Sequence, residues 1–194
     1  MDVLIKPMET EEEIRGKARV HWQAWHEAYT GLIRQDFLDQ WTLEACTRRA
    51  FRWTDGTLVA KDGDRVVGFV CTGDRGQEVP GVGEVFALYV LAEYYGSGLG
   101  QRLMQAGLEA LGEYPEICLW VLKGNARAIR FYENAAFALT AARRSAPPTA
   151  ARSCAWCWSD AIKKCLRFLD RQGPQALFLF YGPNRGTLSS PDSP

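Results

Sequence analysis

The sequence lacks the features that mark three broad classes of protein. Its 23 Lys and Arg residues are balanced by 23 Asp and Glu, so it lacks the basic excess of a nucleic-acid binder. It contains no run of the roughly 20 apolar residues that a membrane helix needs. Its first residues lack the apolar core and small-residue cleavage site of a signal peptide. We therefore expect a cytoplasmic protein with neither a nucleic-acid nor a membrane partner.

Metal ligands are also scarce. The two histidines, His21 and His26, lie far in sequence from the Cys-x-x-Cys segment at residues 154–157. A four-ligand zinc site needs a second pair of ligands, and no second Cys-x-x-Cys supplies one. We therefore expect no metal, with a zinc or redox site at 154–157 as the alternative. Three other cysteines are expected to be buried, reduced thiols: Cys46, Cys71 and Cys118.

The 194 residues suit one domain with a sizeable core. Apolar patterns, caps and turn residues predict the order β-α-α-β-β-β-α-β-α. In the first helix Thr10 is the expected N-cap, and Glu13 completes a capping box. The expected helices are Glu9–Tyr29, Gln35–Trp53, Gln101–Leu111 and 125–135. The expected strands are 2–7, 57–61, 65–72, a strand that begins at Glu84, and 117–122, with a Gly/Pro loop over 73–83.

The most informative segment is the apolar strand from Glu84 and the turn Tyr95-Gly-Ser-Gly-Leu-Gly100 that follows it. The turn opens a helix, so free backbone N–H groups and the positive end of the helix dipole meet there. Such a place suits a phosphate or pyrophosphate. The turn has neither the G-x-G-x-x-G spacing of a dinucleotide fold nor the Gly-Lys-Ser/Thr ending of a P-loop. A pyrophosphate ligand of another kind is therefore favoured.

The turn resembles the acetyl-CoA loop of the GCN5-related N-acetyltransferase (GNAT) family, Arg/Gln-x-x-Gly-x-Gly/Ala, with Tyr95 in place of the usual first residue. The family's second signature, Asn-x-x-Ala-x-x-Phe-Tyr-x-x-x-Gly-Phe, is matched from Asn125 to Phe137, except that Ala136 replaces the glycine. The resemblance covers roughly residues 1–140 and implies an α/β (α+β) domain there. A GNAT-like domain has a mixed, mostly antiparallel central sheet with helices on both faces, and uses acetyl-CoA as acyl donor.

The resemblance also implies which residues hold acetyl-CoA. The strand around Tyr89 would pair with the pantetheine arm, and a backbone N–H there would stabilise the oxyanion. This pairing requires the strand to splay from the strand 117–122. The turn would bind the pyrophosphate through backbone amides, and Asn125 would bond the pantetheine. The implied cofactor-binding residues are Leu88, Tyr89, Val90, Tyr95, Gly96, Ser97, Gly98, Leu99, Gly100, Gln101, Asn125 and Tyr132.

The implied reaction transfers acetyl to a primary amine and needs a base and an acid. An alkyl ammonium with a pKa near 10 must lose a proton before it attacks, which costs roughly 4 kcal/mol at neutral pH. Glu84 matches the position at which several family members carry a catalytic glutamate. Period 2 places its side chain on the face of Phe86, Leu88 and Val90. Tyr132 matches the family's general acid for the thiolate. The alternative role for Glu84 is a solvated carboxylate at a strand end, and the alternative for Tyr132 is a core aromatic residue.

The first helix supplies rival bases and a candidate acceptor site. His21 and His26 titrate in the useful range, although helix histidines more often pack or face solvent. Trp25 and Tyr29 share a helical face and could attract an amine by cation–π contact, with an ordinary core stripe as the alternative. The acceptor would be a small-molecule amine or a protein N-terminus. A homodimer stays open beside a monomer.

Residues 141–194 differ in composition from the rest of the chain. The Pro147-Pro148 pair cannot lie inside a paired central strand. We expect a short helix at Ser159–Arg171, an apolar run at Ala176–Tyr181 and a disordered polar tail. The family's last two strands would then be missing, which would expose a sheet edge. The segment is either a lineage-specific extension or the result of a reading-frame change near residue 140.

Two other functions therefore stay open beside the acetyltransferase. One is a non-catalytic acyl-CoA-binding or regulatory module, which would keep the glycine-rich turn but show no turnover. The other is a compromised product whose altered C-terminus prevents the fold from completing its site.

Overall fold

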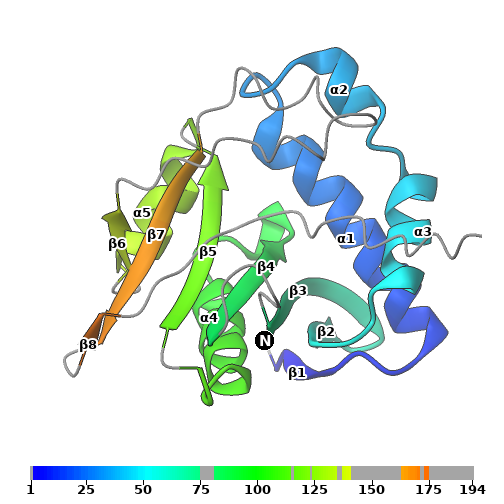
Figure 1. Ribbon diagram of the computed structural model, residues 1–194. Helices are drawn as coiled ribbons and strands as arrows, with labels where there is room; N and C mark the ends of the chain where they lie inside the picture. Colours follow the sequence, from blue (N-terminus) through cyan, green and yellow to red (C-terminus); the bar gives the residue numbers. More distant parts are fainter. Residues whose placement is uncertain are drawn as a thin grey trace, which may run out of the picture.

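A computed structural model describes residues 2–74, 81–114, 116–122, 124–134, 137–140, 163–170 and 173–174. The main sheet has the order β1-β2-β3-β4-β5-β7-β6, and β8 pairs with β7 (Figure 1). Among these strands β4 and β5 pair in parallel, and the other neighbours are antiparallel. The predicted mixed, mostly antiparallel sheet is confirmed. The strands are β1 Leu4–Pro7, β2 Thr57–Asp62, β3 Arg65–Asp74, β4 Val82–Val90, β5 Glu116–Leu122, β6 Phe137–Thr140, β7 Lys163–Asp170 and β8 Gly173–Pro174.

Helices cover both faces of the sheet, as predicted. On β3, α1 places the Lys17 ammonium 5.0 Å from the centre of the Phe69 ring, whereas Gly107 of α4 packs against Val70. Neighbouring residues of a strand point to opposite faces, so α1 and α4 lie on opposite sides. The helices are α1 Glu11–Tyr29, α2 Gln35–Asp39, α3 Leu43–Arg52, α4 Leu99–Ala110 and α5 Ala126–Asn134, with a short 3-10 turn at Ala92–Tyr94.

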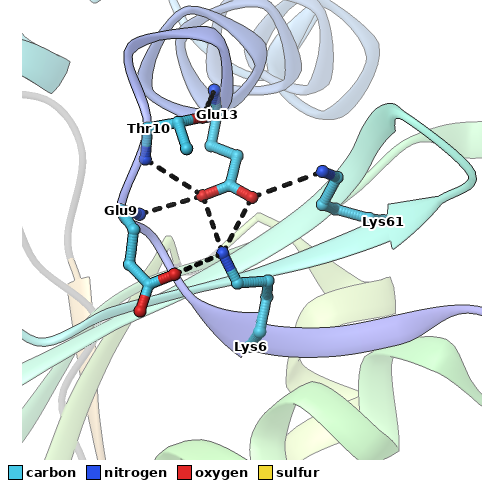
Figure 2. Close-up of polar contacts among 5 residues, drawn as sticks. All are labelled: Lys6, Glu9, Thr10, Glu13 and Lys61. Atoms are coloured by element: carbon cyan, nitrogen blue, oxygen red, sulfur yellow. Dashed lines mark hydrogen bonds and ion pairs between the residues drawn. The ribbon is translucent and has the colours of Figure 1, made fainter.

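The predicted capping box of α1 is present and forms part of a larger polar cluster (Figure 2). Thr10 Oγ1 accepts from the Glu13 N–H at 3.2 Å, and the Glu13 carboxylate accepts from the Thr10 and Glu9 N–H groups. Lys6 Nζ and Lys61 Nζ also reach this carboxylate, at 3.0 and 3.3 Å. The Glu9 N–H is the main cause of a low Glu13 pKa of about 2, and the lysines and Thr10 lower it further against the opposing effect of burial.

Replacing Glu13 with Gln is expected to destabilise the fold by about 2–3 kcal/mol, because Lys6 and Lys61 lose their shared carboxylate. The folded pKa of about 2 lies below the ordinary 4.5, so this stabilisation is complete above about pH 4.5 and is lost as pH falls through about 2. Urea unfolding over this pH range measures the difference in free energy of unfolding between wild type and Glu13→Gln, with the exposed Glu12→Gln as control. A difference that does not shrink toward pH 2 would contradict the stabilising role of the ionised Glu13 carboxylate.

The predicted helix Gln35–Trp53 is wrong in its middle, where the structure separates α2 from α3. Thr42 begins α3 as its N-cap, with Oγ1 accepting from the Ala45 N–H at 3.1 Å. Between the two helices Trp41 is buried and stacks on Trp25 of α1, with ring centroids 4.1 Å apart. The cap and this tertiary contact together favour the break, and the contact has no counterpart in the local sequence pattern.

The C-terminal segment contradicts two predictions. Lys163–Asp170 form the strand β7 rather than part of the expected helix, and β7 pairs with β5 on one side and β6 on the other. The edge of β5 is therefore covered, so the prediction that the last strands are missing is wrong. The unpaired backbone groups of β5 favour pairing over the weak local preference for helix. The expected apolar run, polar tail and Cys-x-x-Cys at 154–157 lie outside the described residues.

Two apolar clusters form the core. The larger lies between the sheet and its helices, and it includes Cys118. The smaller lies among α1, α2 and α3, includes Trp25 and Cys46, and has Tyr29 and Tyr89 packed against it. Cys46 and Cys118 are buried thiols as predicted, whereas Cys71 is only half-buried. None of the helices within the described ranges combines the length and apolar character needed to cross a membrane.

Candidate active site

Strands β4 and β5 form a fork. They pair only where Val82–Glu84 lie beside Glu116–Cys118. Beyond that point β4 continues along β3 as far as Val90, while β5 pairs with β7 (Figure 1). Within the described part of the chain, no strand pairs with the β5-facing edge of residues 85–90. The predicted splay is therefore present, and it leaves backbone N–H and C=O groups of β4 available to an extended ligand.

Glu84 lies at the closed end of this fork. It is in register with Gly73 of β3 on one side and with Cys118 of β5 on the other. Its side chain is buried, with a residue exposure of 5%. A solvated strand-end carboxylate, the alternative raised from the sequence, is therefore wrong. A buried carboxylate is costly to keep unless it has partners or a function.

A β-bulge precedes the open part of the fork and changes which side chains share a face. Cys71 lies opposite Ala87, but the next residue, Thr72, lies opposite Val85. Phe86 is therefore an extra residue in β4, as in a β-bulge. Because Cys71 and Thr72 point to opposite faces, Ala87 and Val85 do so as well.

The bulge corrects the predicted orientation of Glu84. Strict alternation places it with Phe86, Leu88 and Val90, but the observed register places it on the face of Ala87 and Tyr89, away from Leu88 and Val90. Phe86 does lie on the Glu84 side, since a Cβ at Gly73, the partner of Glu84, would be 3.0 Å from the Phe86 ring. This is the face that α1 covers, since the Tyr89 ring contacts aromatic rings of that helix. The candidate base and the candidate acceptor wall of α1 therefore lie on the same side of β4.

The glycine-rich turn has the geometry expected of an anion site. Gly96 and Gly98 have φ values of 75° and 84°, and Gly98 is the N-cap of α4. Their left-handed conformation suits glycine, which carries no Cβ. The Ser97 hydroxyl donates to the Tyr94 carbonyl at 2.7 Å and accepts from the Leu99 N–H at 3.3 Å. Ser97 therefore braces the turn, and the first backbone N–H groups of α4 are the groups that suit a phosphate.

Three aromatic residues form a hydrogen-bonded group beside the fork, which we call the aromatic wall: Trp25, Tyr29 and Tyr89. The Trp25 indole N–H donates to Tyr89 Oη at 2.9 Å, and the Tyr89 and Tyr29 hydroxyl oxygens are 3.2 Å apart. An indole only donates, so Tyr89 Oη accepts from Trp25, and either hydroxyl can be the donor between Tyr89 and Tyr29. When Tyr89 is the donor, the hydroxyl hydrogen of Tyr29 is available to a ligand.

Tyr132 and Asn125 occupy buried positions on and next to α5. Tyr132 is 2% exposed, and burial raises its pKa well above the usual range, with Tyr29 raising it further. It therefore stays protonated at physiological pH. Asn125 Oδ1 accepts from the Ala128 N–H at 3.0 Å and so caps α5. The same side chain retains its NH2 group as a donor.

A family model described as "Acetyltransferase (GNAT) family" matches residues 18–137. The chain belongs to the GNAT acetyltransferase family. It is 35% identical over 116 residues to an uncharacterized N-acetyltransferase of Archaeoglobus fulgidus, covering 55% of this chain and 76% of that protein. It is 31% identical over 127 residues to the uncharacterized N-acetyltransferase YuaI of Bacillus subtilis, covering 63% and 73%. Its fold is similar to that of the PaiA N-acetyltransferase of Thermoplasma acidophilum in complex with coenzyme A, with a TM-score of 0.63, 17% identity and coverage of 84% and 98%.

This GNAT protein is an acetyl-CoA-dependent acetyltransferase, with acetyl-CoA as its acyl donor. The structure places several of the predicted site residues on β4 and the turn that follows it, while Asn125 and Tyr132 belong to α5 and its start. Glu84 lies at the closed end of the fork and Leu88–Val90 at its open end, and the segment Tyr95–Gln101 runs from the glycine-rich turn into the first turn of α4. Burial is the main cause of the raised pKa values of Tyr89 and Tyr132, and Tyr132 adds to the first as Tyr29 adds to the second, so the three phenols lie near one another.

The rival bases of the GNAT domain are placed less favourably. His21 is buried among aromatic rings whose centroids lie 5.2 to 6.1 Å away. Burial lowers its pKa well below 6.5, and the charges of Lys17 and Arg49 lower it further, so it stays neutral. His26 Nδ1 lies 2.8 Å from the Trp22 carbonyl of its own helix. Both histidines thus behave as packing or helix-surface residues.

Two side-chain contacts in the GNAT site have no signal in the sequence. The Tyr89 phenol bonds Trp25, 64 positions away in sequence, and Arg127 Nη2 donates to Tyr95 Oη, 32 positions away. The family resemblance implies only a backbone role for Tyr89, and no sequence pattern points to Arg127. No local pattern predicts contacts at such separations, so only the folded chain shows them.

Proposed function

We propose that this enzyme transfers the acetyl group of acetyl-CoA directly to a primary amine within a ternary complex. The observation that carries the proposal is the buried Glu84 carboxylate at the closed end of the β4–β5 fork, on the face of Tyr89. A base and an aromatic wall therefore share one side of β4. The edge of the same strand that no described strand covers leads toward the glycine-rich turn.

Backbone groups would provide most of the acetyl-CoA site. Leu88–Val90 would pair with the amides of the pantetheine arm, as an added strand pairs with a sheet edge. The N–H groups of Gly96, Gly98, Gly100 and Gln101 would hold the pyrophosphate at the N-terminus of α4, whereas those of Ser97 and Leu99 donate within the turn. The Asn125 NH2 group, fixed in place by the cap that its oxygen makes, would donate to the pantetheine.

Glu84 would take a proton from the ammonium and free the nitrogen lone pair for attack on the thioester carbon. The Tyr89 N–H would stabilise the negative charge that develops on the carbonyl oxygen as the C–N bond forms. As the C–S bond breaks, Tyr132 would donate its phenol proton to the sulfur. Burial keeps this phenol protonated until that step. The nitrogen loses its second proton to solvent as the amide forms, and the tyrosinate recovers a proton from solvent.

The aromatic wall is the proposed site for the acceptor, a small-molecule amine or a protein N-terminus. A cationic amine is attracted by the faces of Trp25 and Tyr29 before it loses its proton. The Tyr29 hydroxyl would donate to an oxygen of the acceptor. This residue lies at the end of α1 and is half-buried, so it combines a fixed position with access to a ligand.

Calorimetric titration of the full-length protein with acetyl-CoA, coenzyme A and ATP tests the donor site, and thiol release with a panel of amines tests the reaction. We expect micromolar binding of acetyl-CoA, no binding of ATP, and coenzyme A release that depends on the amine. Binding without turnover on any primary amine would contradict amine transfer and favour a non-catalytic acyl-CoA-binding module. A folded protein that does not bind acetyl-CoA would contradict the donor site.

Replacing Tyr29 with Phe is expected to raise the KM of the acceptor about threefold to tenfold, the effect of one neutral hydrogen bond. The affinity for acetyl-CoA should not change, since Tyr29 belongs to the acceptor wall. Steady-state kinetics with an amine identified in the panel measures both quantities. An unchanged acceptor KM, or an equal loss of acetyl-CoA affinity, would contradict this placement.

A further inference from the structure

The glycine-rich turn has no basic side chain of its own. The segment from Tyr95 to Gln101 contains no Lys, Arg or His. The next residue, Arg102, is engaged elsewhere, because its Nη2 donates to the carbonyl oxygen of Val3 at 2.7 Å. Backbone N–H groups and a helix dipole carry only partial charges, whereas a pyrophosphate carries full negative charges. A cation from another element would complete this site.

Arg127 of α5 lies against the turn. Its Cζ is 3.8 Å from the centre of the Tyr95 ring, and its Nη2 donates to Tyr95 Oη at 2.9 Å. The guanidinium therefore stacks on the first residue of the turn, where the family pattern has Arg or Gln. The Arg127 charge also lowers the pKa of Tyr29, against the larger effect of burial, so its field extends to the aromatic wall.

A second contact fixes α5 to the same place. A Cβ at Gly100, in the first turn of α4, would lie only 3.3 Å from the Phe131 ring. Phe131 and Arg127 are four residues apart and share one face of α5. One face of α5 thus contacts both the beginning of the glycine-rich turn and the beginning of α4. The packing of α5 against α4 therefore holds Arg127 beside the turn.

We propose that Arg127 is the cation of the pyrophosphate site and that Tyr95 is the residue that positions it. The inference rests on the proposed placement of the pyrophosphate at the turn. A guanidinium has five N–H donors, and the bond to Tyr95 uses one of them. Stacking on the ring leaves the planar fork free to bind phosphate oxygens in pairs. Arg127 is exposed, so the phosphate can reach it.

Calorimetry of Arg127→Gln with coenzyme A, dephospho-coenzyme A and pantetheine tests the assignment. We expect affinity for the two pyrophosphate-containing ligands to fall about tenfold to a hundredfold, with pantetheine unaffected. The difference from wild type should shrink as salt is added, because an exposed charge is screened. Arg130→Gln is the matched control, since this arginine is exposed on the same helix and its Nε donates to the Ala126 carbonyl. It should bind all three ligands like wild type.

Variants of Tyr95 test whether this residue acts by positioning Arg127. Tyr95→Leu removes the platform and should lose nearly as much affinity as Arg127→Gln, whereas Tyr95→Phe keeps the ring and should lose less. Combining Tyr95→Leu with Arg127→Gln should add little, since both changes remove one interaction. Full additivity of the two losses would overturn the positioning role of Tyr95.

Other outcomes overturn the assignment of Arg127. Unchanged coenzyme A affinity in Arg127→Gln, with normal binding by wild type, would overturn this inference and leave the proposed function intact. A loss for coenzyme A but not for dephospho-coenzyme A would assign Arg127 to the 3′-phosphate instead. Wild-type protein that binds neither ligand would overturn the placement of the pyrophosphate and this inference together.

Discussion

Replacing Glu84 with Gln is expected to lower kcat for amine acetylation about 100-fold to 1000-fold, the usual contribution of a general base. The change keeps the shape of the buried side chain but removes its ability to take a proton. Activity of the variant should rise with pH more steeply than that of wild type, by about tenfold per unit, because only the already neutral fraction of the amine can react. Steady-state kinetics across a pH series measures both effects.

Binding measurements separate this loss from a damaged fold. Acetyl-CoA affinity of Glu84→Gln should equal that of wild type, since the proposed cofactor contacts come from other residues. Glu109→Gln is a matched control, because it removes an exposed carboxylate of α4 and should not alter kcat. Full activity in Glu84→Gln would contradict the role of the base and leave the buried carboxylate with a structural role.

Replacing Gly98 with Val is expected to weaken acetyl-CoA binding at least about tenfold. Gly98 has a φ of 84° and caps α4, and a β-branched residue is strained in that conformation by roughly 1–3 kcal/mol. A side chain at this position would also stand where a phosphate must approach the backbone N–H groups. Calorimetric titration with acetyl-CoA measures the loss of affinity.

Gly63 provides the control for backbone strain. It has a φ of 58°, and a Cβ there would meet no atom within 4 Å. Gly63→Val should therefore destabilise the fold by a similar amount without changing the affinity for acetyl-CoA. Equal affinity in the two variants would show that Gly98 acts only through stability, and would contradict a pyrophosphate site at the turn.

The parts of the fold that the sequence predicted well depend on local signals. Thr10 and Glu13 form the capping box that their spacing indicates, because both partners belong to one helical turn. Gly96 and Gly98 adopt the left-handed conformation that only glycine enters readily. The splay of β4 from β5 followed from the resemblance to a family rather than from local chemistry.

The incorrect predictions concern features that the partner strand or a distant residue decides. The extra residue Phe86 is set by how β4 pairs with β3, so strict alternation assigned Glu84 to the wrong face. Trp41 interrupts a predicted helix because it stacks on Trp25. The β7 segment pairs with β5 although its own sequence suggested a helix, which shows tertiary pairing outweighing local propensity.

The sequence predicts the part of the aromatic wall that lies on α1, but not the Tyr89 side chain that links it to β4. Trp25 and Tyr29 were predicted to share a helical face, which the structure confirms through their contact at a centroid distance of 5.0 Å. Their link to β4 depends on the Tyr89 phenol, which reaches both of them. The side chain of Tyr89 points toward α1 only because of its register with β3, so this link could not be predicted without the sheet.

A backbone amide NMR titration of the full-length protein with acetyl-CoA tests the central claim most directly. The claim is that the open edge of β4 and the turn before α4 form one continuous donor site. The account predicts that the largest shifts fall on Leu88–Val90 and Gly96–Gln101, with ATP causing none of comparable size. Shifts confined to other elements, or the same shifts with ATP, would contradict it.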